Sequence, residues 1–202
     1  MKTLRGFSLI ELIVGMAILG ILMSIGIPAF SDWMRNARVR TTAESVLNGL
    51  QLARAEAVRR NTTVGLYLVT TTTSACALST AGPNWIVSFT DPTGECATPP
   101  HADLDLSTLE DDDPRIIQAH SSAESSGATI ITAVQPSYLF TGLGRLNVTP
   151  ASDDEGVPGA ILFESATGGT CGTVRCLKVS VSLGGQIRMC DPALPTGDTQ
   201  AC

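Results

Sequence analysis

A run of 24 residues near the N-terminus, Phe7 to Phe30, contains a single charged side chain, Glu11. As a helix this run would be about 36 Å long, which is enough to cross the hydrocarbon core of a bilayer. Lys2 and Arg5 precede it, so the positive-inside rule leaves the N-terminus in the cytoplasm and sends the rest of the chain outward. The sequence therefore predicts one membrane-spanning helix with a domain on the far side of the membrane.

Glu11 needs a physical explanation, because an ionised carboxylate inside a membrane is costly unless it meets a countercharge. One interpretation places the carboxyl close enough to the membrane surface to reach water. The other leaves the carboxyl inside the apolar environment, where it must find a partner. Pro28, late in the same run, removes one helical hydrogen bond and would permit a kink or local melting.

The sign of the charge changes after residue 60. Residues 31–60 hold six arginines and three acidic side chains, whereas residues 61–202 hold five basic and fifteen acidic ones. The acidic part does not favour bulk attraction to nucleic acid, because that attraction comes from Lys and Arg neutralising phosphates. We expect the arginines on a solvated helix face, with contact to lipid headgroups or neighbouring subunits as the alternative.

Apolar side chains recur at steps of three and four between Ser31 and Asn61, which predicts an amphipathic helix that continues the apolar run. Arg59, Arg60 and Asn61 are typical of a helix C-terminus. Further along, alternating or β-branched runs predict strands. They lie at residues 62–69, 85–89, 115–119, 129–134, 138–140, 160–163, 177–182 and 186–189.

All six cysteines lie in the acidic part of the chain. An even number outside the apolar run indicates disulfides in an oxidising compartment, and the zinc alternative lacks the CxxC pairs or histidine partners it needs. In the last hairpin, a three-residue loop at 183–185 keeps the apolar side chains of both strands on one face, and this register sets Cys190 opposite Lys178. Of fifteen possible pairings it favours Cys190 with Cys202, Cys171 with Cys176 and Cys76 with Cys96.

No catalytic residue, cofactor or metal is expected. His101 and His120 flank an acidic loop without a nucleophile motif beside them, so we interpret both as exposed loop histidines. The run Glu110 to Asp113 could bind Ca²⁺ weakly, but it lacks the alternate ligand spacing and the glycine of a dedicated loop. We interpret this run as solvated charge.

The string GFSLIE at Gly6 to Glu11, between a short basic leader and an unbroken apolar run, resembles the prepilin peptidase signature of type IV pilins and type II secretion pseudopilins. The resemblance implies that a membrane peptidase cuts between Gly6 and Phe7 and methylates the new amine of Phe7. It also implies that Glu11 pairs with the Phe7 ammonium of a neighbouring subunit during assembly. Such pairing would penalise helices packed out of register.

The segment LQLARAEAVRRNTTVGL, Leu50 to Leu66, resembles the GspH/FimT family of minor pilins and minor pseudopilins. This implies an α+β type IV pilin fold, in which a long N-terminal helix, membrane-spanning in its first half, packs on an antiparallel β-sheet domain with disulfides. The expected organisation is a leader at 1–6, a transmembrane and assembly helix at 7–30, the amphipathic half of that helix at 31–61 and a periplasmic β-rich head at 62–202.

The function implied is structural and not enzymatic. The chain would be a minor type IV pilin in the priming complex that starts pilus assembly and remains at the tip; the alternative is a minor pseudopilin of type II secretion. Its partners would be other minor subunits, the major pilin or pseudopilin, the prepilin peptidase and the inner membrane. It would be a single-pass inner-membrane protein with a periplasmic head before assembly and part of a filament afterwards.

Some members of this family are DNA-uptake receptors with a Gly-Arg-x-Arg motif in the C-terminal hairpin. Here residues 185–188 read Gly-Gln-Ile-Arg, so one arginine is missing. Arg175, Lys178 and Arg188 could still share a face, and they are the candidate DNA contacts. The acidic head argues against DNA as a partner, and the alternative role of the hairpin is contact with a neighbouring subunit.

Overall fold

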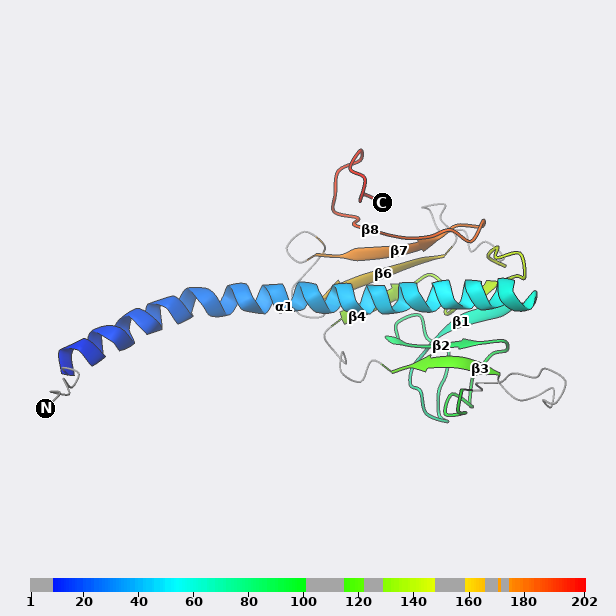
Figure 1. The fold of residues 1–202 in the computed structure, drawn as a ribbon, viewed down its shortest axis with the longest axis horizontal. Helices are drawn as coiled ribbons and strands as arrows, with labels where there is room; N and C mark the ends of the chain where they lie inside the picture. Colours follow the sequence, from blue (N-terminus) through cyan, green and yellow to red (C-terminus); the bar gives the residue numbers. More distant parts are fainter. Residues whose placement is uncertain (1–8, 101–114, 122–128, 148–158, 166–170, 172–174) are drawn as a thin grey trace, which may run out of the picture.

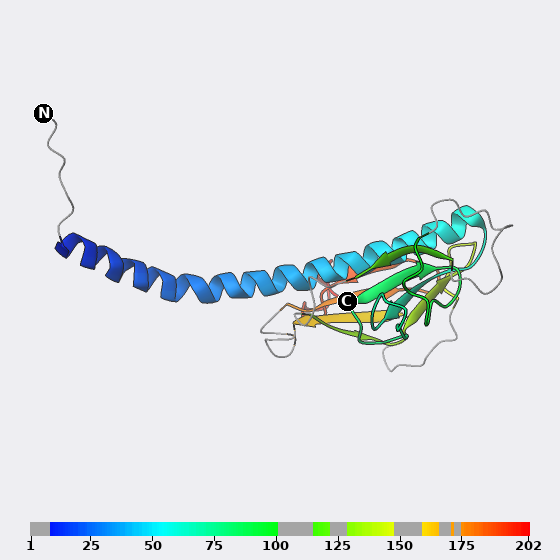
Figure 2. The ribbon, with the colours of Figure 1, turned by 90° about the horizontal axis from the view of Figure 1, so that it is seen from below.

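The computed structural model describes residues 9–100, 115–121, 129–147, 159–165, 171 and 175–202. One helix, α1 (Leu9–Arg60), projects far beyond the β-rich head on its N-terminal side (Figure 1). It continues through residue 28 without a break and curves in its N-terminal half (Figure 2). The strands are β1 (Val64–Val69), β2 (Asn84–Ser88), β3 (Ile116–His120), β4 (Thr129–Ala133), β5 (Ser137–Phe140), β6 (Ala160–Ser165), β7 (Leu177–Val181) and β8 (Ile187–Cys190).

The strands form two four-stranded antiparallel sheets, in the orders β3-β2-β1-β5 and β4-β6-β7-β8. The C-terminal half of α1 lies across both (Figure 1) and contacts strands of each. Small residues on its inner face, Ala43, Ala53 and Ala57, are fully buried and let the helix approach closely. Val58 is apolar but 52% exposed, because it is rotated about 100° around the helix from the buried Ala57.

The end of α1 is a Schellman motif. Asn61 has φ 49°, its N–H donates to the carbonyl of Val58, and the N–H of Thr62 donates to the carbonyl of Ala57. The prediction that Asn61 caps the helix is confirmed. The chain turns at once into β1, which places the first strand directly beside the helix that precedes it.

All eight predicted strands are present, each within two residues of its expected ends. The predicted register of the last hairpin is also confirmed, with Val181 opposite Ile187 and Val179 opposite Met189. The three predicted cysteine pairs are those that the structure joins: Cys76–Cys96, Cys171–Cys176 and Cys190–Cys202.

β1 is buried along its whole length, because both faces of its sheet are covered. One face packs on α1, and the other carries a second apolar cluster that includes Tyr67, Ile86 and Ile116. Cys76 and Cys96 belong to this cluster and are 4% and 2% exposed. Their disulfide therefore fastens the segment after β1 and the segment after β2 over the outer face of the sheet.

Replacing Cys76 and Cys96 together by serine is expected to lower the free energy of unfolding by about 3 kcal/mol, because the bond closes a loop of 20 residues and holds the second cluster together. Urea unfolding of the purified chain, followed by the fluorescence of buried Trp85, measures this loss. The matched control is the pair Cys190→Ser and Cys202→Ser, which opens a loop of 12 residues and should cost less. An equal or larger loss in the control would contradict this assignment of the outer cluster.

Candidate assembly sites

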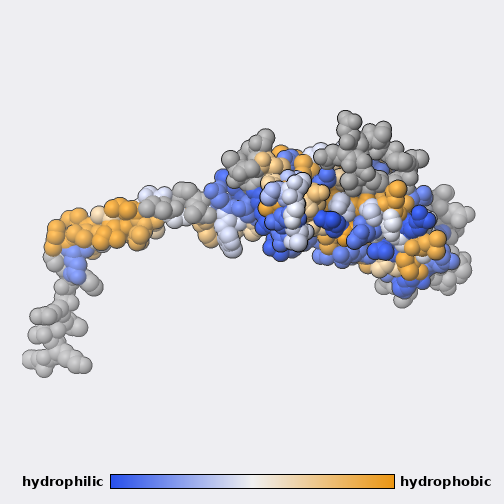
Figure 3. Space-filling view, turned by 90° about the horizontal axis from the view of Figure 1, so that it is seen from above, coloured by the Kyte–Doolittle hydropathy of each residue, from blue (hydrophilic) through white to orange (hydrophobic). Residues whose placement is uncertain are grey.

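The N-terminal half of α1 exposes apolar side chains all round the helix, and Figure 3 shows one face of this surface. A helix that is apolar all round is stable only when something apolar covers it. Among the described residues no helix is long and apolar enough to cross a membrane, so the predicted span stays a prediction. The exposed side chains, 49–77% accessible, are Leu9, Ile10, Leu12, Ile13, Val14, Met16, Ile18, Leu19, Ile21, Leu22, Met23, Ile27, Phe30 and Trp33.

Glu11 lies in the first turn of α1, where the helix dipole favours an anion. Its side chain is exposed and borders a shallow hollow with Leu12, Gly15 and Met16. A Cβ added at Gly15 would meet nothing within 4 Å. Within the described residues Glu11 has no ion-pair partner, so an incoming cation could reach it. The proposed cleavage site at residues 6 and 7 lies outside the described residues.

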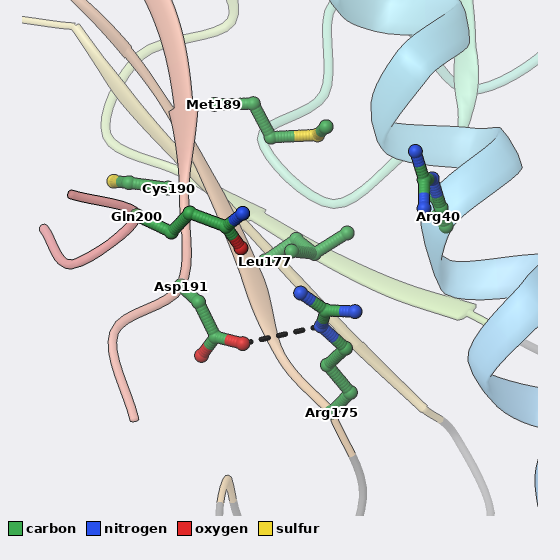
Figure 4. Close-up of a pocket in the computed structure, with 7 residues that line it drawn as sticks. All are labelled: Arg40, Arg175, Leu177, Met189, Cys190, Asp191 and Gln200. Atoms are coloured by element: carbon green, nitrogen blue, oxygen red, sulfur yellow. Dashed lines mark hydrogen bonds and ion pairs between the residues drawn. The ribbon is translucent and has the colours of Figure 1, made fainter. Parts of the chain in front are cut away.

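A pocket of about 260 Å³ lies where α1 enters the head, between α1 and the edge formed by β7 and β8 (Figure 4). We call it the basic pocket. Arg175 donates from Nε to Oδ2 of Asp191 at 3.2 Å, and its backbone N–H donates to Oδ1 of Asn36 in α1 at 3.2 Å. The bond to Asn36 ties the backbone of Arg175 to the helix, and the bond to Asp191 ties its side chain to the residue after β8. The lining includes Arg40, Arg175, Leu177, Met189, Asp191 and Gln200.

The structure does not bring Arg175, Lys178 and Arg188 together on one face. Arg175 lines the basic pocket with Leu177, on the side of the sheet that faces α1. Lys178 follows Leu177 in β7, so the alternation of strand side chains turns it to the opposite face. Arg188 lies on that opposite face too, and its Nη2 donates to the carbonyl of Ala201 at 3.0 Å. The three cations therefore do not form one surface for a phosphate backbone.

The C-terminal end of α1 packs against two loops of the head, the turn that holds Gly144 and the β7–β8 loop. The sequence did not predict this contact. Nε of Arg54 donates to the carbonyl of Gly144 at 3.2 Å. Gly185, in the β7–β8 loop, lies so close to that carbonyl that a Cβ at residue 185 would overlap it. Leu183 accepts a hydrogen bond from the N–H of Leu146 at 3.1 Å. The C-terminal end of α1, the turn that holds Gly144 and the β7–β8 loop thus pack together at one corner of the head.

Glu56 supplies the main ion pairs at this end of α1. Its carboxylate accepts from Arg59 at 2.6 Å and from Arg60 at 2.8 Å. Burial opposes ionisation, but the two arginines outweigh it and hold the pKa of Glu56 below its ordinary value. Because the folded state lowers this pKa, the stabilisation is present at neutral pH and is lost as the pH falls through the acidic range.

The remaining candidates for chemistry are structural or lie outside the described residues. His120 is not an exposed loop residue: it ends β3, is half-buried and stacks on Trp85 with ring centroids 5.1 Å apart. Glu164 approaches Cys171 and Cys176, but both sulfurs are joined in a disulfide and so are not thiolate ligands. His101 and residues 110–113 lie outside the described residues.

A β-rich head on the second half of a long helix, whose first half is apolar all round, defines a pilin-like filament subunit. The chain belongs to the family described as type II transport protein GspH, whose model matches residues 42–185, and residues 1–27 match the prokaryotic N-terminal methylation motif. It is thus a member of the minor pilin and pseudopilin family, and the family predicted from the sequence is confirmed.

Solved structures similar to this chain include a minor pilin and a GspH protein. The crystal structure of the type IV minor pilin FimU from Pseudomonas aeruginosa matches with a TM-score of 0.51 at 17% identity, covering 84% of this chain and 98% of that one. The solution structure of Escherichia coli GspH matches with a TM-score of 0.42 at 15% identity, over 81% of this chain and 94% of that one. The FimU match supports the α+β pilin fold.

Proposed function

We propose that this chain is a minor type IV pilin that joins other minor subunits in the complex that starts pilus assembly and stays at the filament tip. The observation that carries the proposal is the N-terminal half of α1, which exposes apolar side chains on every side and carries one carboxylate at its start. Lipid can cover this surface before assembly, and helices of neighbouring subunits can cover it afterwards. The methylation motif over the same residues supports this.

Before assembly the chain is anchored in the inner membrane at residues 7–30, with the head in the periplasm. Lys2 and Arg5 support this orientation, because positive charge stays on the cytoplasmic side. The three disulfides of the head support an oxidising compartment. The prepilin peptidase, the major pilin and the other minor subunits are the partners that this route requires.

Glu11 sets the axial register of the assembled helices by pairing with the methylated Phe7 amine of a neighbour. A carboxylate in apolar surroundings without a countercharge is strongly unfavourable, so helices that miss the pairing are rejected. The exposed position of Glu11 beside the hollow at Gly15 supports this role. Glu11 lies four positions after residue 7 in the sequence. The neighbouring helix must therefore be shifted along the helix axis for its Phe7 amine to meet Glu11 of this chain.

The protein acts as a structural subunit and not as an enzyme. The alternative within the family is a minor pseudopilin of type II secretion, and six cysteines with a long, loop-rich head favour the pilus. We do not propose a DNA receptor, because its candidate cations lie on two faces of the sheet. Deleting the gene distinguishes the two systems: loss of surface pili with normal protein secretion supports the pilin, and the reverse result supports the pseudopilin.

Gly6→Val is expected to block processing, because a β-branched side chain crowds the bond that the peptidase must cut. Mass spectrometry of the membrane-bound protein should find only the uncut precursor, which begins at Met1. The matched control is Gly20→Val, at a helix position where an added Cβ meets nothing within 4 Å, and it should be cut normally. A mature N-terminus at Phe7 in the Gly6→Val protein would contradict the processing site.

A further inference from the structure

We propose that the basic pocket receives an aspartate or glutamate side chain of a neighbouring filament subunit. The proposal rests on the proposed function, since it requires another subunit beside α1. It adds a specific contact in the head, at the point where α1 enters it, to the contacts along the apolar half of the helix.

Arg175 is held in position before any ligand arrives. The side chain of its partner Asp191 is 9% exposed and accepts a hydrogen bond at Oδ1 from the N–H of Ala193 at 3.0 Å. Nε of Arg175 is bound to Asp191, and the two Nη atoms lie on the side of the guanidinium toward Leu177 and the pocket (Figure 4). A guanidinium fixed in this way binds a carboxylate with little loss of side-chain entropy.

Arg40 supplies the second cation from the opposite wall. Nε of Arg40 donates to Glu44 at 2.7 Å, but the side chains are 62% and 42% exposed, and such solvated pairs are weak. Arg40 can therefore turn toward a carboxylate in the pocket. Leu177 and Met189 form an apolar wall that suits the methylene groups of an acidic side chain, and a volume of about 260 Å³ accommodates one.

The position of the pocket favours a protein carboxylate over a lipid phosphate. Arg40 follows Phe30 by ten residues, which is about 15 Å along the helix axis. Each headgroup layer is only about 5–8 Å thick, so the pocket lies beyond it when the apolar run fills the membrane core. A neighbouring subunit that packs along the apolar half of α1 can also reach the basic pocket, because the same helix carries the apolar surface and, further along, Arg40 of the pocket.

The first test compares the incorporation of full-length variants into sheared filaments, with the membrane level of each variant as the reference. Arg175→Gln and Arg40→Gln should each lower incorporation about tenfold or more. Arg38→Gln, which removes the same charge from an exposed position of α1 outside the pocket, should incorporate like the wild type. Arg175→Gln removes the bond to the buried Asp191, whereas Arg40→Gln removes only the exposed pair with Glu44, so Arg40→Gln is the decisive variant. Normal incorporation of Arg40→Gln would overturn the proposal.

The second test identifies the carboxylate. Arg40→Lys places an amine in the pocket, and a water-soluble carbodiimide added to intact filaments joins it to a touching carboxylate as an amide, with one carboxylate oxygen leaving in the urea by-product. A cross-link to an Asp or Glu of another subunit, found by peptide mass spectrometry and absent with Arg38→Lys, supports the proposal. Cross-links to Glu44 alone, or to a lipid headgroup, overturn it. A wild-type chain absent from all filaments would overturn the proposed function itself.

Discussion

Glu11→Leu is expected to leave a processed, membrane-bound protein that is missing from filaments. Removing one partner of a buried ion pair costs about 3–5 kcal/mol, which corresponds to a loss of incorporation of at least about 100-fold. The leucine adds apolar surface to a helix that already exposes it on every side, so insertion into the membrane should be unaffected. Quantitative immunoblots of membranes and sheared filaments measure both values.

The matched variant is Glu11→Asp, which keeps the charge but shortens its reach, and which should incorporate at a level between those of the wild type and Glu11→Leu. Normal incorporation of Glu11→Leu would remove the basis for a register-setting ion pair. It would favour the other interpretation, in which the carboxyl simply reaches water at the membrane surface.

Gly185→Ala should have the largest effect on the stability of the head. Residue 185 has φ +77°, which costs an L-residue about 1–2 kcal/mol, and an added Cβ would also overlap the carbonyl oxygen of Gly144. The carbonyl cannot move away freely, because it accepts the hydrogen bond of Arg54. We expect the free energy of unfolding to fall by about 3 kcal/mol or more, measured by urea unfolding.

Substitutions at two other glycines distinguish the backbone cost of the positive φ from the steric cost of the overlap. Gly94 has φ +85° with nothing within 4 Å of an added Cβ, so Gly94→Ala should show the backbone cost alone. Gly184 has neither a positive φ nor a close neighbour except Oγ of Ser182 at 3.7 Å, so Gly184→Ala should be nearly neutral. If Gly185→Ala lowered the free energy of unfolding no more than Gly94→Ala does, the close approach of residue 185 to the carbonyl of Gly144 would be contradicted.

Local patterns predicted much of this fold. The register of β7 and β8 follows from alternation alone, because the apolar side chains of both strands must share the face toward α1. That register led to the cysteine pairing, and Asn61 could be assigned because few residues adopt a positive φ. The processing motif is equally local, since it lies within a few consecutive residues.

Features built from distant segments could not be predicted in the same way. The division of the strands into two sheets depends on β1 pairing with β5 and on β4 pairing with β6, which no local pattern encodes. The basic pocket joins Arg40 to Arg175 across most of the sequence. One signal was available: the strand VGLYLV is apolar without alternation, which indicates burial on both faces and hence a cover for the outer one.

The proposed place of the chain at the filament tip is tested most directly by immunogold electron microscopy of pili, with antibodies raised against the head. We expect gold particles at one end of individual filaments and none along their length. Label distributed along the filaments, or filaments without label in cells that carry the protein in their membranes, would contradict it.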